Sequence, residues 1–205
     1  MRRAANPWDR FYKDHIAPWR GERDVTTMLP WLTTGRVLEL GVGNGKTLHP
    51  LLQAGVAVVG LDISFHALRR LPSGGVLADA ACLPFADETF SAVLDLHCTG
   101  HLPGAKRREA LCEARRVTKP GAILLMERLG PDDLRATGAG TSDGTGARVL
   151  ADGRMTWFLG APELEAEATA AGWDVENLEV NQWRPTIRGE RVLRQTLRLR
   201  LRRPE

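Results

Sequence analysis

Three glycines at alternate positions, Gly41, Gly43 and Gly45, directly follow a short apolar run in this chain of 205 residues. The run, Arg36–Leu40, is predicted to be a strand, and a helix is predicted to follow the glycines and to continue to Leu52. Glycine lets a strand turn sharply into a helix and lets the backbone approach a ligand closely. The segment therefore predicts a strand–turn–helix unit with a binding site at the turn.

The alternation of apolar runs and helix-like stretches continues along the chain. Further strands are predicted at 56–62, 75–78, 90–96 and 122–127, with helices over 65–71 and 106–118. Such alternation is typical of βαβ units. After Gly130 the pattern breaks, and residues 130–147, rich in Gly, Thr, Ser and Asp, are predicted to be a mobile loop. The remainder predicts a hairpin with a type I′ turn at Asp152-Gly153, a helix over 162–171, and strands at 173–180 and 192–201.

The spacing of the glycines separates three classes of ligand. A dinucleotide fingerprint, G-x-G-x-x-G, would need the third glycine one residue later. A P-loop needs four residues between its first glycine and Gly-Lys-Thr, and Gly41 to Gly45 leaves three, so Lys46-Thr47 is out of register. The spacing that fits is E/D-x-G-x-G-x-G, beginning at Glu39.

This turn, with several segments that follow it, resembles the class I S-adenosylmethionine-dependent methyltransferases, in particular the small type 11 or UbiE-like branch. The resemblance covers roughly residues 35–180. Its further segments are Gly60-Leu61-Asp62-Ile63-Ser64, Asp79-Ala80, Leu83-Pro84-Phe85, Arg116–Ala122 and Trp157–Trp173.

The resemblance implies an α/β fold: a Rossmann-like doubly wound sheet of about seven strands, mostly parallel with an antiparallel last strand, and helices on both faces. It implies a single domain, with an N-terminal lid or cap (1–34), a cofactor-binding core (35–129) and a C-terminal part (130–205). The implied activity is methyl transfer from S-adenosylmethionine, with S-adenosylhomocysteine as product, and a small-molecule acceptor is favoured.

The resemblance also implies a set of cofactor-binding residues in the turn and at the strand ends: Glu39, Gly41, Val42, Gly43, Asn44, Gly45, Asp62, Ile63, Asp79, Ala80, Leu96 and His97. Asp62 is expected to accept both ribose hydroxyls, Glu39 to hold the ammonium group and Asp79 to contact the adenine. From the residues alone, Glu39 is also compatible with an ordinary strand-end acid, Asp62 with a helix N-cap ahead of Phe65, and Asp79 with a turn residue.

Two histidines after the fourth predicted strand, His97 and His101, are candidate general bases, because an imidazole titrates near neutrality. The alternative, which we favour, is that both shape the pocket, since methyl transfer depends largely on positioning. The segment Asp95–Gly100 also resembles the Asp-x-Pro-Cys-x-Gly motif of RNA cytosine-C5 methyltransferases, whose cysteines act covalently. Here the proline and a second cysteine motif are missing.

Aromatic residues are concentrated before the first predicted strand. Many members of the family close the site with an N-terminal helix, and Trp8, Tyr12 and Trp19, together with Trp157, are therefore candidate lid and acceptor-contact residues. The alternative is a helix that packs its aromatic side chains on the sheet. The loop 130–147 is a second candidate lid.

The net charge of +3 permits an anionic partner without requiring nucleic acid. Six arginines between 191 and 203 alternate with leucines, and a solvated edge strand is favoured over a nucleic-acid contact. Transfer RNA or other RNA remains an alternative acceptor, and a catalytically silent cofactor-binding protein an alternative function. Intact motif residues argue against the silent protein.

Three cysteines without a C-x-x-C pair predict neither a disulfide framework nor a zinc or other metal site. We expect no membrane span and no signal peptide, because the chain has neither a run of about 18 apolar residues nor an apolar N-terminus. The expectation is a cytoplasmic protein that is a monomer or a homodimer.

Overall fold

The computed structural model describes residues 6–16, 18–32, 35–72, 74–142, 144 and 146–205. Its helices are α1 (Pro7–Asp14), α2 (Leu48–Gln53), α3 (Phe65–Leu68), α4 (Gly104–Val117) and α5 (Ala161–Ala170), with 3-10 turns η1 (Leu29–Trp31), η2 (Thr99–His101) and η3 (Leu134–Ala136). Its longer strands are β1 (Arg36–Leu40), β2 (Ala57–Asp62), β4 (Phe90–Leu96), β5 (Thr118–Leu129), β9 (Asp174–Trp183) and β12 (Arg194–Arg202). The short strands are β3 (Val76–Leu77), β6 (Thr141–Ser142), β7 (Ala147–Val149), β8 (Met155–Trp157), β10 (Thr186–Ile187) and β11 (Glu190–Arg191).

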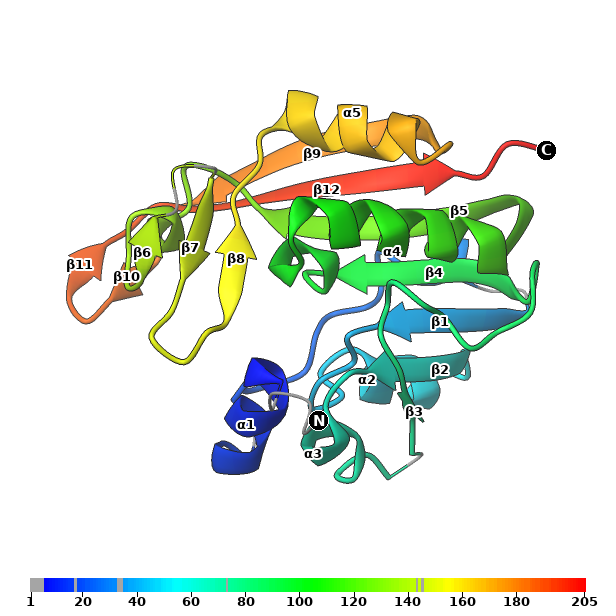
Figure 1. The fold of residues 1–205 in the computed structure, drawn as a ribbon, viewed down its shortest axis with the longest axis horizontal. Coiled ribbons are helices and arrows are strands. Elements are labelled where there is room, and N and C mark those ends of the chain that lie inside the picture. Colours follow the sequence, from blue (N-terminus) through cyan, green and yellow to red (C-terminus); the bar gives the residue numbers. More distant parts are fainter. Residues whose placement is uncertain (1–5, 17, 33–34, 73, 143, 145) are drawn as a thin grey trace.

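The main sheet, counted over the described residues, has seven strands in the order β3-β2-β1-β4-β5-β12-β9. β1 runs parallel to β2 and β4, β4 runs parallel to β5, and β12 is antiparallel to both β5 and β9. The predicted fold class is therefore confirmed. The strand order reverses between β1 and β4, and in sheets of this kind ligands bind at the carboxyl ends of the strands at that reversal. α1 and the β6–β7–β8 sheet lie beyond those ends (Figure 1).

The sheet is buried on both faces. Adjacent residues of a strand point to opposite faces, and four consecutive residues of β1 are all buried. Leu38 and Leu40 pack in a cluster that includes residues of α4 and α5, while Val37 packs with α2 and with Val25 and Leu32 of the N-terminal segment. Trp173, 1% exposed, anchors the first cluster, and its indole N–H donates to the backbone oxygen of a residue in α4 at 3.1 Å. The N-terminal segment from Val25 onward is therefore part of the core.

The region after Gly130 differs from the prediction of a featureless mobile loop. Its described residues form η3, β6 and β7, and β7 pairs with β8 as the predicted hairpin. The predicted two-residue type I′ turn is wrong: Leu150 N–H bonds Arg154 O at 2.7 Å, and three residues lie between them. Gly153 takes φ of +85°, the left-handed residue that a three-residue hairpin loop requires.

The helix predicted over 65–71 is also shorter than expected, because α3 ends at Leu68. Leu71 precedes Pro72, and a residue before proline disfavours helical backbone. Leu71 N–H instead bonds Leu68 O at 3.0 Å in a turn.

The arginine-rich last strand is not the solvated edge strand that we predicted. β12 lies between β5 and β9, so β9 forms the edge. All four of its arginines, and Arg203 just after it, pair with carboxylates of neighbouring segments: Arg194 with Asp133, Arg198 with Glu127, Arg200 and Arg202 with Glu176, and Arg203 with Glu88. The alternation places these cations where carboxylates of β5, of β9 and of the loops meet them.

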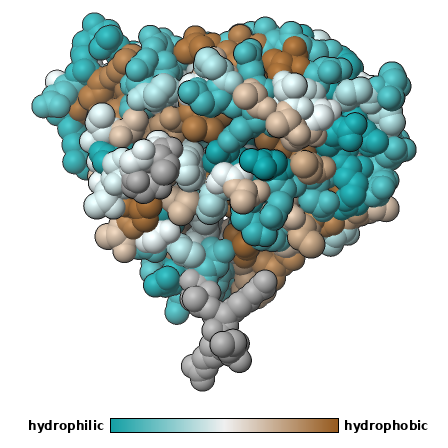
Figure 2. All heavy atoms as spheres, turned by 45° about the horizontal axis from the view of Figure 1, so that its top comes forward, coloured by the Kyte–Doolittle hydropathy of each residue, from teal (hydrophilic) through white to brown (hydrophobic). Residues whose placement is uncertain are grey.

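The face that includes α5 carries mostly hydrophilic residues, with hydrophobic ones scattered among them (Figure 2). In the described part of the chain, no helix is long and apolar enough to cross a membrane. Cys82, Cys98 and Cys112 are all free thiols.

Candidate cofactor and acceptor site

The glycine turn after β1 depends on backbone that other residues rarely adopt. Gly41, Gly43 and Gly45 have φ of +65°, +55° and +79°, in the left-handed region that favours glycine. A Cβ on Gly41 would lie 2.7 Å from Cys98, and one on Gly43 would lie 2.4 Å from the Tyr12 hydroxyl. Glycine is therefore required in this turn both by the backbone conformation and by the closeness of Cys98 and Tyr12.

Asp62, the last residue of β2, connects the two loops at this edge of the sheet. Its Oδ2 accepts a hydrogen bond from Gly43 N–H at 2.8 Å, and its Oδ1 accepts one from Ser64 N–H at 2.8 Å. Burial raises its pKa, and backbone hydrogen bonds from Ser64, Gly43 and Ile63 counteract that effect. The cap of α3 is Ser64, whose hydroxyl accepts from Ala67 N–H at 3.1 Å, so the helix-cap interpretation of Asp62 is wrong. A carboxylate has about four acceptor positions, so these bonds do not occupy all of them.

Glu39, one residue before the end of β1, is a buried carboxylate without a full set of partners. It is 4% exposed, and its Oε2 has no hydrogen-bond partner. Burial raises its pKa to about 8, while the charge of Arg23 and a hydrogen bond with Thr47 lower it. A buried, unpartnered carboxylate oxygen is a position where a cationic group would be stabilised.

Asp79 follows β3 and accepts a hydrogen bond from Ala81 N–H at 2.9 Å. This bond forms a local turn, as the alternative interpretation anticipated, and it occupies one of the two carboxylate oxygens. Three other predicted cofactor residues are close in the sequence to the ends of strands. Ile63 is 40% exposed, Ala80 is buried, and Leu96 is half-buried.

The N-terminal segment covers the glycine turn. Tyr12 in α1 is 4% exposed, and Trp19 donates its indole N–H to the Tyr12 hydroxyl at 2.9 Å. Asp9 accepts hydrogen bonds from Ser64 Oγ at 2.9 Å and from His66 N–H at 3.1 Å, which ties α1 to α3. The segment therefore lies where a lid was predicted.

A second set of contacts ties α1 to the β7–β8 hairpin. The Arg154 guanidinium lies 3.6 Å from the Phe11 ring centroid and 5.1 Å from that of Trp8. Trp8 also packs against the His101 ring at 4.6 Å. Of the four predicted lid and acceptor residues, Trp8, Tyr12 and Trp19 thus lie together, whereas Trp157 lines a separate pocket with Arg128.

The two candidate bases after β4 have different surroundings. His101 Nδ1 donates to Met155 O at 2.8 Å, and burial lowers its pKa to about 4. His97 has φ of +77°, and its Nε2 lies 3.0 Å from Glu127 Oε1. The Nδ1 of His97 is buried and has no partner. Because the Glu127 carboxylate accepts a hydrogen bond from Nε2–H, the lone pair of the neutral His97 ring is on Nδ1, which has no partner and is free to accept a proton.

Glu127 and Arg23 are polar residues of this edge that the sequence analysis did not assign. Arg23 forms a two-point ion pair with Glu127, at 3.0 and 3.2 Å, and Arg198 bonds Glu127 at 2.7 Å. Burial raises the Glu127 pKa, but hydrogen bonds from His97 and Arg23 bring it well below its usual range. Glu127 is near the carboxyl end of a parallel strand beside β4, a position that could have indicated it. Arg23 precedes the first strand in a segment without any pattern.

Asp95, Thr99 and Arg128 form a second buried polar group next to His97. Asp95 accepts from Thr99 N–H at 3.0 Å and from Thr99 Oγ1 at 2.7 Å, and it pairs with Arg128. Burial and the charge of Asp95 raise the pKa of the Cys98 thiol. A protonated thiol does not favour the covalent mechanism of cytosine-C5 methyltransferases.

Residues 38–126 match the model of a methyltransferase domain, the type 11 family. The match begins in β1 and ends in β5, so it includes the glycine turn, Asp62 and the end of β4. The chain is similar to this methyltransferase family over these residues, which are less than half of its length.

The curated proteins that this chain resembles have different methyl acceptors in their names. A demethylmenaquinone methyltransferase of Renibacterium salmoninarum is 41% identical over 96 residues, which is 44% of this chain and 40% of the relative. A tRNA N(3)-methylcytidine methyltransferase of Drosophila melanogaster is 26% identical, with 85% of this chain and 63% of the relative covered. The chain therefore spans about half the length of the curated relatives that it matches.

A solved structure has a similar fold over the whole length of this chain. The 1,6-didemethyltoxoflavin-N1-methyltransferase of Burkholderia thailandensis, with bound 1,6-didemethyltoxoflavin and S-adenosylhomocysteine, has a TM-score of 0.70 at 17% identity. The alignment covers 100% of this chain and 93% of that structure. At this identity the likeness concerns the fold.

Proposed function

We propose that this domain binds S-adenosylmethionine at the carboxyl ends of β1 and β2 and transfers its methyl group to a small-molecule acceptor. The observation that carries the proposal is the unpartnered Oε2 of the buried Glu39, two residues before the glycine turn. S-adenosylmethionine has an ammonium group and two ribose hydroxyls. The ammonium group is matched by this buried carboxylate, and the hydroxyls by a second carboxylate, Asp62, at the next strand end.

Each residue at this edge has a role that follows from its contacts. Glu39 binds the ammonium group of the cofactor. The positive charge of that group offsets the cost of keeping the Glu39 carboxylate ionised while it is buried. Asp62 is fixed by Gly43 and Ser64 N–H groups, so that its remaining acceptor positions receive the ribose hydroxyls. When bound, S-adenosylmethionine supplies a methyl group on a positively charged sulfur.

His97 accepts the proton that the acceptor loses, for acceptors that are hydroxyl, acid or protonated amine groups. Glu127 fixes the ring, because its carboxylate holds the Nε2 proton and leaves Nδ1 free. His101, with a pKa of about 4 and a backbone partner at Met155, shapes the pocket instead. This assignment differs from the preference reached from the sequence, which gave both histidines a shaping role.

Calorimetry with S-adenosylhomocysteine tests the proposal directly. We expect low- to mid-micromolar affinity, about −7 to −8 kcal/mol. Absence of binding by either form of the cofactor at millimolar concentration would overturn the proposal. Binding of ATP in their place would favour the P-loop alternative.

Transfer RNA is a second candidate acceptor, because the Drosophila relative aligns with 85% of this chain. The pairing of most β12 arginines with carboxylates leaves less free positive charge for phosphates than the sequence suggested. Filter binding of tRNA across a salt series separates the two classes, since phosphate contacts give a steep loss of affinity with salt. A steep slope and sub-micromolar binding would favour tRNA.

A further inference from the structure

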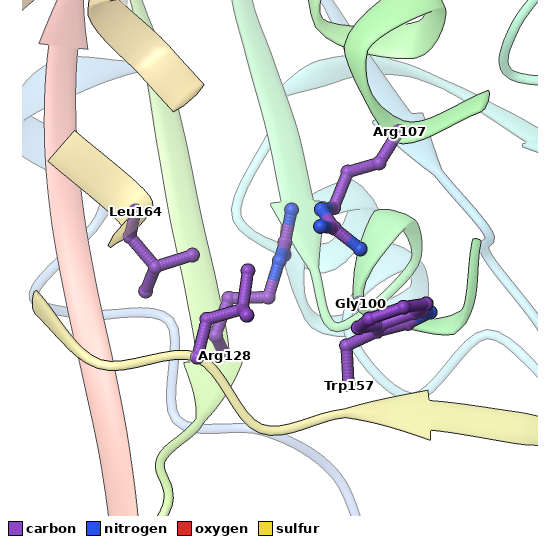
Figure 3. A pocket seen from close by; sticks show the side chains of 6 residues that line it. Gly100, Arg107, Arg128, Trp157 and Leu164 are labelled. Carbon is purple, nitrogen blue, oxygen red and sulfur yellow. The ribbon is translucent and has the colours of Figure 1, made fainter. Parts of the chain in front are cut away.

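A narrow pocket lies where η2, β5, β8 and α5 meet (Figure 3). Its lining residues are Gly100, Arg107, Arg128, Trp157, Leu159 and Leu164. Gly100 follows β4 and Arg128 is near the end of β5, so the pocket is at the same edge of the sheet as the glycine turn. Arg107 points from α4 toward the Trp157 ring, and its guanidinium lies 4.9 Å from the ring centroid.

The two arginines of the pocket already have counter-charges. Arg128 pairs with Asp95 and also donates to Asp95 O at 3.0 Å, and Arg107 Nε donates to Glu167 Oε2 at 2.6 Å. Both arginines are 3% exposed. An anion in this pocket would find no unpaired cation, and a buried unpaired charge is strongly unfavourable.

Two N–H donors of the pocket nevertheless lack partners. Arg128 Nε and Trp157 Nε1 are buried and make no hydrogen bond. Each of these groups donates and cannot accept. Buried donors without partners are rare in folded proteins, and here both belong to one pocket. The side chains of Leu159 and Leu164 supply apolar walls beside them.

We propose that this pocket binds a neutral oxygen of the methyl acceptor, a carbonyl or ether-type oxygen on an apolar, ring-sized group, through Trp157 Nε1 and Arg128 Nε. The inference rests on the proposed function, because it names the class of acceptor for the proposed methyl transfer. An uncharged oxygen accepts hydrogen bonds from these two N–H donors and adds no unpaired charge to the pocket. The leucines and the indole contact the apolar part of the ligand.

Entry of a ligand requires one wall to move, because the pocket is too narrow for a water molecule in this structure. We infer that Trp157 is this wall. It ends β8 in the small β6-β7-β8 sheet, which is separate from the main sheet. Arg128, in contrast, is fixed by the polar group around Asp95.

Three probes that share a phenyl ring test the inference: acetophenone has a neutral carbonyl, benzoate a carboxylate, and toluene no oxygen. Each is titrated into the ¹⁵N-labelled full chain, with and without S-adenosylhomocysteine, while the tryptophan indole N–H signals are recorded. The Trp157 signal is assigned by its loss in Trp157→Phe. We expect acetophenone to shift it saturably, and toluene and benzoate to shift it little.

Trp157→Phe keeps a ring but removes the N–H, so it is expected to weaken acetophenone binding about five- to tenfold in saturation-transfer measurements. The matched control is Trp183→Phe, at an exposed position on β9, which is expected to change nothing. A second variant, Gly100→Ala, adds a methyl group 3.0 Å from Arg128 Cδ and is also expected to reduce acetophenone binding.

Three outcomes would overturn the inference: tighter binding of benzoate, equal binding of toluene and acetophenone, or no shift of the Trp157 signal with any probe. Calorimetry of S-adenosylhomocysteine on the same samples separates this failure from that of the proposed function. If the cofactor product binds and the probes do not, the pocket assignment alone is wrong. If the product does not bind, the proposed function is wrong.

Discussion

The carboxylate of Asp62 accepts a 2.8 Å hydrogen bond from the backbone N–H of Gly43, which ties the end of β2 to the turn after β1. The same carboxylate accepts from Ser64 N–H, so one side chain orders the loops on either side of the proposed ribose position. Residues 19 apart in the chain thus fix each other before any ligand arrives. Preorganisation of this kind reduces the entropy lost on binding.

Asp62→Ala should therefore reduce both cofactor affinity and stability. The affinity loss is expected to be about 2–4 kcal/mol, because two hydroxyls lose a charged acceptor. The free energy of unfolding should fall by about 1–3 kcal/mol, because the Gly43 and Ser64 N–H groups lose their partner. Calorimetry with S-adenosylhomocysteine and denaturant titration measure the two effects. Thr47→Ala tests the P-loop alternative; it removes one hydrogen bond to Glu39 and should weaken binding less than Asp62→Ala. A larger effect of Thr47→Ala, with a requirement for magnesium, would favour a P-loop.

Glu39 should make stability and cofactor binding depend on pH. Its pKa is about 8 in the folded chain against 4.5 as the ordinary value, so the folded state holds one more proton between these limits. The stability of the wild type relative to Glu39→Gln should therefore fall as pH rises from 4.5 to 8, by at most about 1.4 kcal/mol per pH unit. Above pH 8 the difference should be constant. Chemical denaturation of both proteins across this range measures it.

Binding of the cofactor's ammonium group should ionise Glu39, because a nearby cation favours the charged form. At pH 6 to 7 the wild type should release a proton on binding, and its affinity should increase toward pH 8. Calorimetry in two buffers of different ionisation enthalpy detects the released proton. Glu39→Gln should show none. An equal release from both proteins would mean that another group titrates.

The sequence predicted the parts of the site that depend on local backbone chemistry. The glycine turn, the strand that ends at Asp62 and the strand before His97 require particular residues at fixed spacing, and the structure places them together. Arg23 and Glu127 could not be predicted in this way. Their pairing joins residues 104 apart in the chain, and neither residue type is unusual at its position.

The place of β12 between β5 and β9, rather than at the edge of the sheet, was not predicted for a related reason. Alternating arginine and leucine is compatible with an edge strand, and the carboxylates that neutralise the arginines lie on other segments. Asp133, Glu176 and Glu127 come into contact with β12 through the sheet order, which no local pattern reveals.

His97→Gln should lower kcat by about 10²- to 10⁴-fold with an acceptor that loses a proton, and should leave S-adenosylhomocysteine affinity within a factor of a few. Glu127→Gln should shift the acidic limb of the kcat–pH profile, because it removes the charge that fixes the Nε2 proton. His101→Gln, the control, should leave the pH profile unchanged, since burial keeps that ring neutral. If the His101 variant moved the profile and the His97 variant did not, the roles of the two histidines would be reversed.

The last prediction concerns the N-terminal segment as a lid. Tyr12 covers Gly43, and α1 is held by side-chain contacts from Asp9 and Arg154, whereas the sheet core packs on Val25 and Leu32 further along. Deletion of residues 1–21 should therefore leave a folded domain, shown by an intact unfolding transition. The deletion should weaken retention of S-adenosylhomocysteine about tenfold or more, because the turn loses its cover. Hydrogen exchange should be fast over Phe11 to Trp19 in the free protein and slow when the product is bound, since segments that open to admit a ligand have low local stability. Equally strong protection in both states would mean that α1 is a fixed part of the fold, and the cofactor would then need another route to the turn.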